Sequence, residues 1–319
     1  MILVAVFVIS LFIGRYAISP SSLLELVTGR ADPDGMDSII FFTVRLPRMI
    51  AAILIGAALS VSGATYQGVF RNPLVSPDIL GAAAGASFGA ALAIFMGFDK
   101  IWLQVLAFGF GLLGVAVSYI IGTRLSGRMR ENTVTLVLCG MVITAIFSAL
   151  ISAVKLGADP YDELPTITFW LMGGLTYVTS DDIYIMLAPL CIGGILLFLM
   201  RFRINVLSLS DEEISAIGID AGRARGIIIL CATLLTSSAV AVGGMIAWVG
   251  LIVPHIARLL TGPDYRKLLP ASLMIGAIFL MVVDNFARTL LAIELPLGVL
   301  TAIVGAPLFL VLLVRSGKE

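Results

Sequence analysis

The sequence predicts an all-α polytopic membrane protein with about ten transmembrane helices, and its composition is the first reason. Of its 319 residues, 60% are hydrophobic and only 13% are charged, whereas a soluble domain has about 25% charged residues. Uncharged runs recur along the chain at about the 20-residue length that a helix needs to cross a bilayer. Basic and acidic residues number 20 each, so no basic surface suggests nucleic acid as a partner.

Ten runs are predicted to cross the membrane within a single domain, residues 1–319. The first, Met1–Gly14, is short and is expected to continue past Arg15, whose charged group can reach the interface; a signal peptide is the alternative. The uncharged run Gly226–Ala257 is too long for one span and too short for two full ones. We therefore expect a full span that ends at Ala247 and a short one over Trp248–Leu260. The other spans are Met49–Phe70, Ile79–Phe98, Ile101–Thr123, Asn132–Val154, Ile183–Met200, Leu268–Val283 and Leu295–Val314.

The distribution of charge predicts that both termini lie in the cytoplasm. An even number of spans places the termini on one side, and most basic residues then fall in loops on that side, as the positive-inside rule requires. Arg45 and Arg48 lie against this trend, on the outside. Lipid headgroups or an acidic patch of another protein are the two partners considered for them. The run Leu164–Ser180 has interfacial threonines and aromatic residues, so we expect a short amphipathic surface helix there.

A weak internal repeat favours an inverted relation between spans 2–5 and spans 7–10. Its signal is a set of glycines and a proline that recurs at a constant offset of 181 residues. The matched pairs are Gly63 with Gly244, Pro73 with Pro254, and Gly81 with Gly262.

The chain lacks the motifs of an enzyme, and we expect it to bind no metal or cofactor. It has no nucleotide-binding glycine-rich loop, so it is not expected to hydrolyse ATP. Its cysteines, Cys139, Cys191 and Cys231, are too far apart for a disulfide or redox motif. The single histidine, His255, is interpreted as structural. Asp284 is either part of an ion relay or, as we favour, an interface residue that faces headgroups beside Arg288.

The segment 201–225, between spans 6 and 7, is predicted to be a cytoplasmic loop that contains a short amphipathic helix. Acidic residues in the first turn suit the helix dipole, and a glycine suits the end of a helix. A solvated connector is one interpretation, and a docking helix for a cytoplasmic partner is the one we favour. The helix is expected to have Ser210 as its N-cap, Asp211, Glu212 and Glu213 in its first turn, Ile214 and Ile217 on its apolar edge, and Gly218 at its end.

Three long motifs resemble the FecCD-type permeases, which are membrane subunits of type II ABC importers for iron–siderophore complexes, haem and vitamin B12. The first is RLPRMIAAILIGAALSVSGATYQGVFRNPLVSPDILG, Arg45–Gly81. The others are GGMIAWVGLIVPHIARLLTG, Gly243–Gly262, and ELPLGVLTAIVGAPLFLVLL, Glu294–Leu313. They occur in the family's order and extend the resemblance over nearly the whole chain.

The resemblance implies partners and functional residues. The partners are a second copy or a close paralogue, two cytoplasmic ATPase subunits that bind ATP and Mg, and a periplasmic or lipid-anchored substrate-binding protein, at a prokaryotic cytoplasmic membrane. The implied docking residues for the binding protein are Arg45, Arg48 and Arg288. Those implied for coupling to the ATPase are Ser210, Asp211, Glu212, Glu213, Ala216 and Gly218. The implied cytoplasmic gate consists of Asn72, Pro73, Leu74 and Thr133.

The function implied is uptake of a metal chelate by ATP-driven alternating access, with spans 5 and 10 lining the pathway. A ferric siderophore is the preferred cargo because it is the commonest in the family. Haem, a corrinoid such as vitamin B12, and molybdate are the alternatives. An ion-coupled secondary carrier is a separate hypothesis, which the scarcity of charged residues in the spans disfavours.

Overall fold

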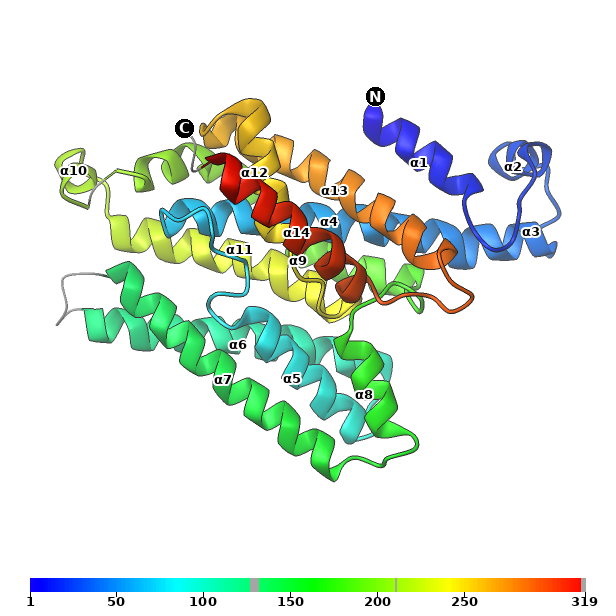
Figure 1. Cartoon of the computed structure of the whole chain (residues 1–319), viewed down its shortest axis with the longest axis horizontal. Coiled ribbons are helices and arrows are strands. Elements are labelled where there is room, and N and C mark those ends of the chain that lie inside the picture. The colour runs from blue at the N-terminus through cyan, green and yellow to red at the C-terminus, as the bar shows by residue number, and fades with distance from the viewer. Residues whose placement is uncertain (127–131, 210, 317–319) are drawn as a thin grey trace.

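The computed structural model is an all-helical bundle, described for residues 1–126, 132–209 and 211–316 (Figure 1). Among these residues, six helices are long and apolar enough to cross a membrane, and four shorter apolar helices accompany them. The long helices are α4 (Leu46–Val69), α6 (Lys100–Ser126), α7 (Asn132–Gly157), α9 (Ser180–Leu207), α11 (Ala221–Gly243) and α13 (Tyr265–Thr289). The shorter ones are α1 (Ile2–Phe12), α5 (Ala82–Phe95), α12 (Val249–Thr261) and α14 (Leu297–Ser316). They coincide with the ten predicted spans, so the fold class is confirmed.

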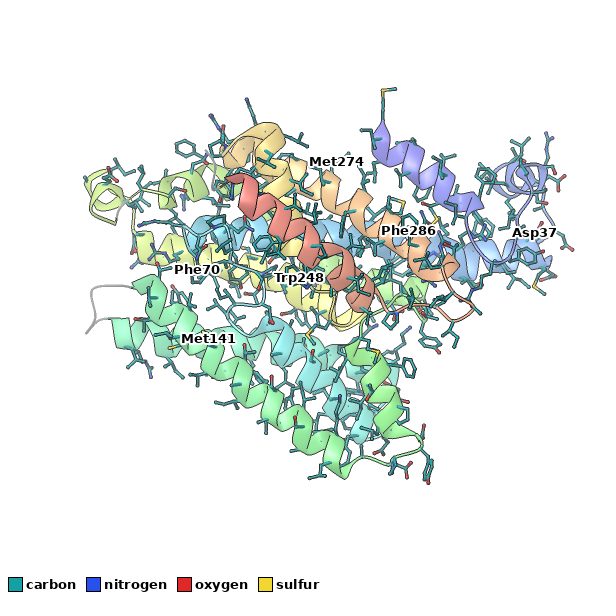
Figure 2. All side chains as sticks on the ribbon, in the orientation of Figure 1. Asp37, Phe70, Met141, Trp248, Met274 and Phe286 are labelled. Carbon is teal, nitrogen blue, oxygen red and sulfur yellow. The ribbon has the colours of Figure 1, made fainter. Side chains whose placement is uncertain are left out.

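The bundle has two ends, which we call the Arg48 end and the Asn72 end because these residues lie at opposite ends of α4. Figure 1 shows the small elements α2 (Pro20–Val27) and α3 (Met36–Ile39) at one extreme of the long axis and α10 (Asp211–Ala216) at the other. In Figure 2, Asp37 lies at the first of these extremes, and Phe70 lies in the half of the molecule toward the other.

The repeat of spans 2–5 and 7–10 is visible in the packing. Helix α4 packs on α12 and α13, and its counterpart α11 packs on α5 and α6. Helices α5, α6 and α7 contact one another, as do α12, α13 and α14. The repeats are inverted, because α4 starts at the Arg48 end whereas α11 follows the segment at the Asn72 end.

The glycine–proline spacing that suggested the repeat does not join equivalent positions. Pro73 lies in the turn after α4, but Pro254 lies inside α12. Gly81 precedes α5, whereas Gly262 follows α12, the counterpart of α5. The repeat is present, but the residues matched by the constant offset are not equivalent within it. Loops of different length in the two halves shift equivalent positions away from a constant offset.

The second span is preceded by helix that the sequence did not reveal. Helix α3 continues through a π-helical turn, η1 (Ile40–Arg45), into α4. Pro47 has no N–H to offer the carbonyl of Thr43, and its ring crowds that carbonyl. A locally widened helix accommodates this mismatch, and within it the Thr43 hydroxyl donates to the Ile39 carbonyl one turn back.

Two surface segments differ from their predicted bounds. The predicted helix over Leu164–Ser180 is shorter, since α8 (Glu163–Leu171) is followed by a turn at Gly173, whose φ is +72°. The predicted loop 201–225 contains the ends of two helices, because α9 continues to Leu207 and α11 begins at Ala221. Only 208–220 connects them, since charged residues at a membrane surface do not end a helix.

Candidate functional site

A buried ion cluster occupies the Arg48 end of the bundle. Arg48 on α4 pairs with Asp284 on α13, with both Nε and Nη2 2.9 Å from Oδ1. Its Nη1 is 2.8 Å from Oε2 of Glu294, just before α14. Arg48 and Asp284 are only 5% and 1% exposed, so the cluster fixes three helices by charge-assisted hydrogen bonds with little screening by solvent.

Arg288 extends this cluster toward α1. Its Nη2 donates to the Ser10 carbonyl at 3.1 Å and to the Asn285 side chain, and its Nε lies 3.7 Å from Asp284. The Asn285 amide donates to the Ser10 hydroxyl at 2.6 Å. Arg15 donates to the carbonyls of Arg288 and Leu291. The first span is thus attached to α13 by polar contacts at this end, in addition to the apolar packing of α1 on the core.

Arg45 is also buried, and it secures the chain between α1 and α2. Its guanidinium donates to the Leu11 carbonyl and, at 2.7 Å, to the Tyr16 carbonyl. Arg45, Arg48 and Arg288 are therefore each hydrogen-bonded within the chain. Their docking role stays a prediction, which requires some of these bonds to be exchanged.

Asp284 likewise departs from its expected place at the lipid interface. It is almost fully buried between Arg48 and Arg288. Its role in the structure is to neutralise two buried guanidinium groups, because charges inside a membrane protein need a partner.

Glu294 connects the ion cluster to a strap, residues 172–179, that lies between α8 and α9. Thr176 donates to Glu294 at 2.8 Å. The strap also receives hydrogen bonds from the start of α14, because Leu297 N–H binds the Gly173 carbonyl and Gly298 N–H binds the Met172 carbonyl. Partial burial would raise the pKa of Glu294, but the charge and hydrogen bond of Arg48 outweigh it and hold that pKa below its ordinary value.

The lowered pKa of Glu294 predicts a pH dependence of stability. Its pairing with Arg48 should contribute fully above the ordinary glutamate pKa of 4.5 and be lost as the pH falls through the lowered folded value. Unfolding midpoints of the wild type and of Glu294→Gln, measured against pH, should therefore converge in acid. A gap that widens as the pH falls would contradict this pairing.

At the Asn72 end, the sequence Asn72-Pro73-Leu74 forms an exposed turn. The Asn72 side chain accepts from Leu74 N–H at 2.9 Å, and Val75 N–H binds the Asn72 carbonyl. Such Asx turns fix short loops without further contacts. Thr133 lies separately, in the first turn of α7. The gate role of these four residues stays a prediction.

Residues 208–220 at the same end contain helix α10; we call them the coupling segment because the predicted ATPase-coupling residues lie there. Ile214 is fully buried, whereas Ile217, expected beside it on an apolar edge, is 56% exposed. Gly218 has a φ of +77°, and Ile219 N–H reaches back to the Ile214 carbonyl. This is a Schellman ending. Glu213 and Ala216 are exposed; Ser210 and the side chains of Asp211 and Glu212 lie outside the described residues.

Gly218→Ala should destabilise the Schellman ending of α10 by about 1 kcal/mol, because a residue with a Cβ is strained in the left-handed backbone conformation. Faster hydrogen exchange at the Ile219 amide would report the loss. Gly222→Ala is the matched control, since Gly222 has no positive φ and an added Cβ would meet only an Asp220 oxygen at 3.4 Å. Equal exchange in both variants would show that the ending needs no glycine.

The faces of α7 and α14 are apolar and exposed. Leu138, Met141 and Val142 of α7, where Figure 2 labels Met141, and Ile303 of α14 are exposed. A groove of about 400 Å³ lies beside α14. Its lining is Leu171, Met172, Met245, Ala247, Gly298, Val299, Ala302 and Ile303.

Within the described residues, no group of three histidine, cysteine or acidic residues could hold a metal.

The ten-helix bundle, with charges neutralised at one end and an uncharged groove beside α14, is that of a multi-pass membrane protein. The model of the FecCD transport family matches residues 2–315. The chain belongs to this family, as its motifs indicated, and family membership places it in the inner membrane.

Its relatives differ in what they are named for. The molybdate import system permease protein MolB of Haemophilus influenzae is 38% identical over 99% of this chain and 94% of that protein. A Helicobacter pylori permease named for iron chelatin transport is 42% identical over 88% of this chain and 83% of that protein. A solved structure described as an inward-facing metal-chelate type ABC transporter matches with a TM-score of 0.89 at 37% identity, covering 98% of this chain and 96% of that one.

Proposed function

We propose that this chain is the permease subunit of an ABC importer that brings a ferric siderophore into a prokaryotic cytoplasm. The observation that carries the proposal is the match, over nearly the whole chain, to an inward-facing metal-chelate type ABC transporter. The iron chelatin relative supports iron as the metal. ATP hydrolysis belongs to separate ATPase subunits in this proposal, so the chain itself is no enzyme.

The orientation follows from charge. The Asn72 end carries Arg71, Arg124 and Arg201, which suits a cytoplasmic side under the positive-inside rule. Both termini then lie in the cytoplasm, and two ATPases bind the segment 208–220. The Arg48 end faces outward and receives the substrate-binding protein, whose carboxylates would compete with Asp284 and Glu294 for the arginines.

Transport proceeds by alternating access in a pair of permease chains, either two copies or a copy and a paralogue. ATP-driven closure of the ATPases tilts α7 and α14, and the chelate enters between their apolar faces. An uncharged pathway suits a large chelate, because strong polar contacts would retain it. The cargo leaves past the turn Asn72–Leu74 and Thr133.

Molybdate is the second candidate cargo. The similarity to the molybdate permease of Haemophilus influenzae extends over 99% of this chain. Molybdate is a small dianion, so its passage would depend on hydration within the pathway rather than on contact with apolar side chains.

A loaded-cargo assay separates the two candidates. The permease, its ATPase and its binding protein are reconstituted in liposomes, and uptake is followed for ferric siderophores, haem, cobalamin and molybdate. We expect uptake and ATPase stimulation with a ferric siderophore. Uptake of molybdate alone would overturn the siderophore assignment while leaving the importer intact.

A further inference from the structure

Arg71 joins the end of α4 to the end of α9. It directly precedes the turn Asn72–Leu74, and its Nε donates to the Leu207 carbonyl at 2.8 Å. Leu207 is the last residue of α9 and is fully buried. The coupling segment begins at the next residue. One side chain therefore bridges the coupling segment and the predicted gate turn.

The backbone of Arg71 indicates that its position is strictly held. Its φ is +52°, and Trp248 is the only other non-glycine residue with positive φ in the part of the chain that the structure describes. Such a conformation disfavours any residue with a Cβ. It persists here because Arg71 N–H binds the Gly68 carbonyl and Asn72 N–H binds the Gln67 carbonyl. Strained residues of this kind concentrate where geometry serves function.

A second contact attaches the end of α9 to α13. The Asn205 amide donates to Asp264 at 2.7 Å, and its oxygen accepts from Tyr265 N–H at 2.9 Å. Gly68 lies against the same junction, since a Cβ there would come within 2.7 Å of Ile204 and Tyr265. The last turn of α9 is thus bonded to α13 on one side and to Arg71 on the other.

We propose that Arg71 is a positioning residue that transmits ATP-driven displacement of the coupling segment to the turn Asn72–Leu74. Movement of residues 208–220 pulls the Leu207 carbonyl, and Arg71 moves the turn with it. Without this bond, the ATPases could cycle while the turn lags behind. This inference rests on the proposed function, since it requires an ATPase that acts on the coupling segment.

Arg71→Gly tests the proposal, because glycine tolerates the positive φ while the bridge is removed. In proteoliposomes we expect ATP hydrolysis to stay within about twofold of wild type and uptake to fall about tenfold, the size of a lost coupling contact. Arg71→Lys should lose about threefold, since an ammonium reaches the carbonyl with poorer geometry. Arg124→Ala, which removes an exposed arginine at the same end, should leave both rates unchanged. Thermal unfolding shows which variants are folded.

A distance measurement adds a readout that a merely stabilising contact would not move. Nitroxide labels replace the exposed residues Leu74 and Leu209 in a chain without its three native cysteines, diluted with unlabelled chains. With Arg71 present, the distribution of distances between the two labels should be narrow, and it should stay unchanged when the ATPases are trapped with ATP. In Arg71→Gly this distribution should broaden.

The outcomes separate the inference from the function on which it rests. If the wild type shows no ATP-driven uptake, the proposed function fails. If the wild type transports and Arg71→Gly transports equally well, the inference is overturned. An unchanged distance in that variant would overturn it too. If Arg71→Gly does not fold, undiminished uptake by Arg71→Lys would overturn the inference in its place.

Discussion

Replacement of Asp284 by alanine should destabilise the protein by about 3–5 kcal/mol, the cost of leaving one partner of a buried ion pair without the other. Arg48 is held by Asp284 through two nitrogens, and both residues are nearly inaccessible to solvent. Arg288 also faces the lost carboxylate. Unfolding in detergent, followed by loss of helical signal against denaturant, measures the change.

A double variant distinguishes the penalty of an unpaired charge from loss of packing. Arg48→Met with Asp284→Leu removes both charges and keeps similar volume, so it should recover much of the stability. Lys155→Ala, at the end of α7, is a surface control and should change stability by less than about 0.5 kcal/mol. An Asp284→Ala protein as stable as the wild type would show that water or lipid headgroups replace the carboxylate.

Gly63→Ala should separate α4 from α12 and cost about 3 kcal/mol through overpacking. An added Cβ at Gly63 would lie only 1.8 Å from the Gly250 carbonyl oxygen. The obstacle is main chain, which cannot rotate away as a side chain can, so one helix must shift. Small residues allow this close approach of membrane helices, and the same unfolding experiment detects its loss.

Gly109→Ala is the matched control for that substitution. Gly109 lies in α6, and nothing stands within 4 Å of a Cβ built there. Alanine also favours a helix over glycine by about 1 kcal/mol. We therefore expect equal or higher stability. If Gly63→Ala behaved like Gly109→Ala, the close packing of α4 on α12 would be refuted.

The spans could be predicted from the sequence because hydrophobic run length is a local property. Helix ends were less predictable, since Arg201 and Arg203 end an uncharged run but lie within α9. The bilayer penalises a charge only at depth, so a charged residue near the surface continues a helix. The π-helical turn before α4 has one local signal, Pro47, and a single proline does not indicate that helix extends back to Met36.

The arrangement of the candidate site was mostly beyond prediction. Arg48 and Asp284 are 236 residues apart in sequence, and no local pattern reveals such a pair. The sequence drew attention to Arg45 and Arg48, but the groups that hold them lie far away in the chain. The hydrogen bond from Arg71 to the Leu207 carbonyl was also not predicted. The positive φ of Arg71 has no signal in the sequence other than the Asn-Pro that follows it.

The most direct test of the importer assignment is the energy source of transport. Uptake into proteoliposomes should require ATP and the ATPase subunits, should stop when those subunits cannot hydrolyse ATP, and should persist when ionophores collapse proton and sodium gradients. Uptake by the permease alone, driven by an ion gradient and indifferent to ATP, would contradict the assignment and favour a secondary carrier.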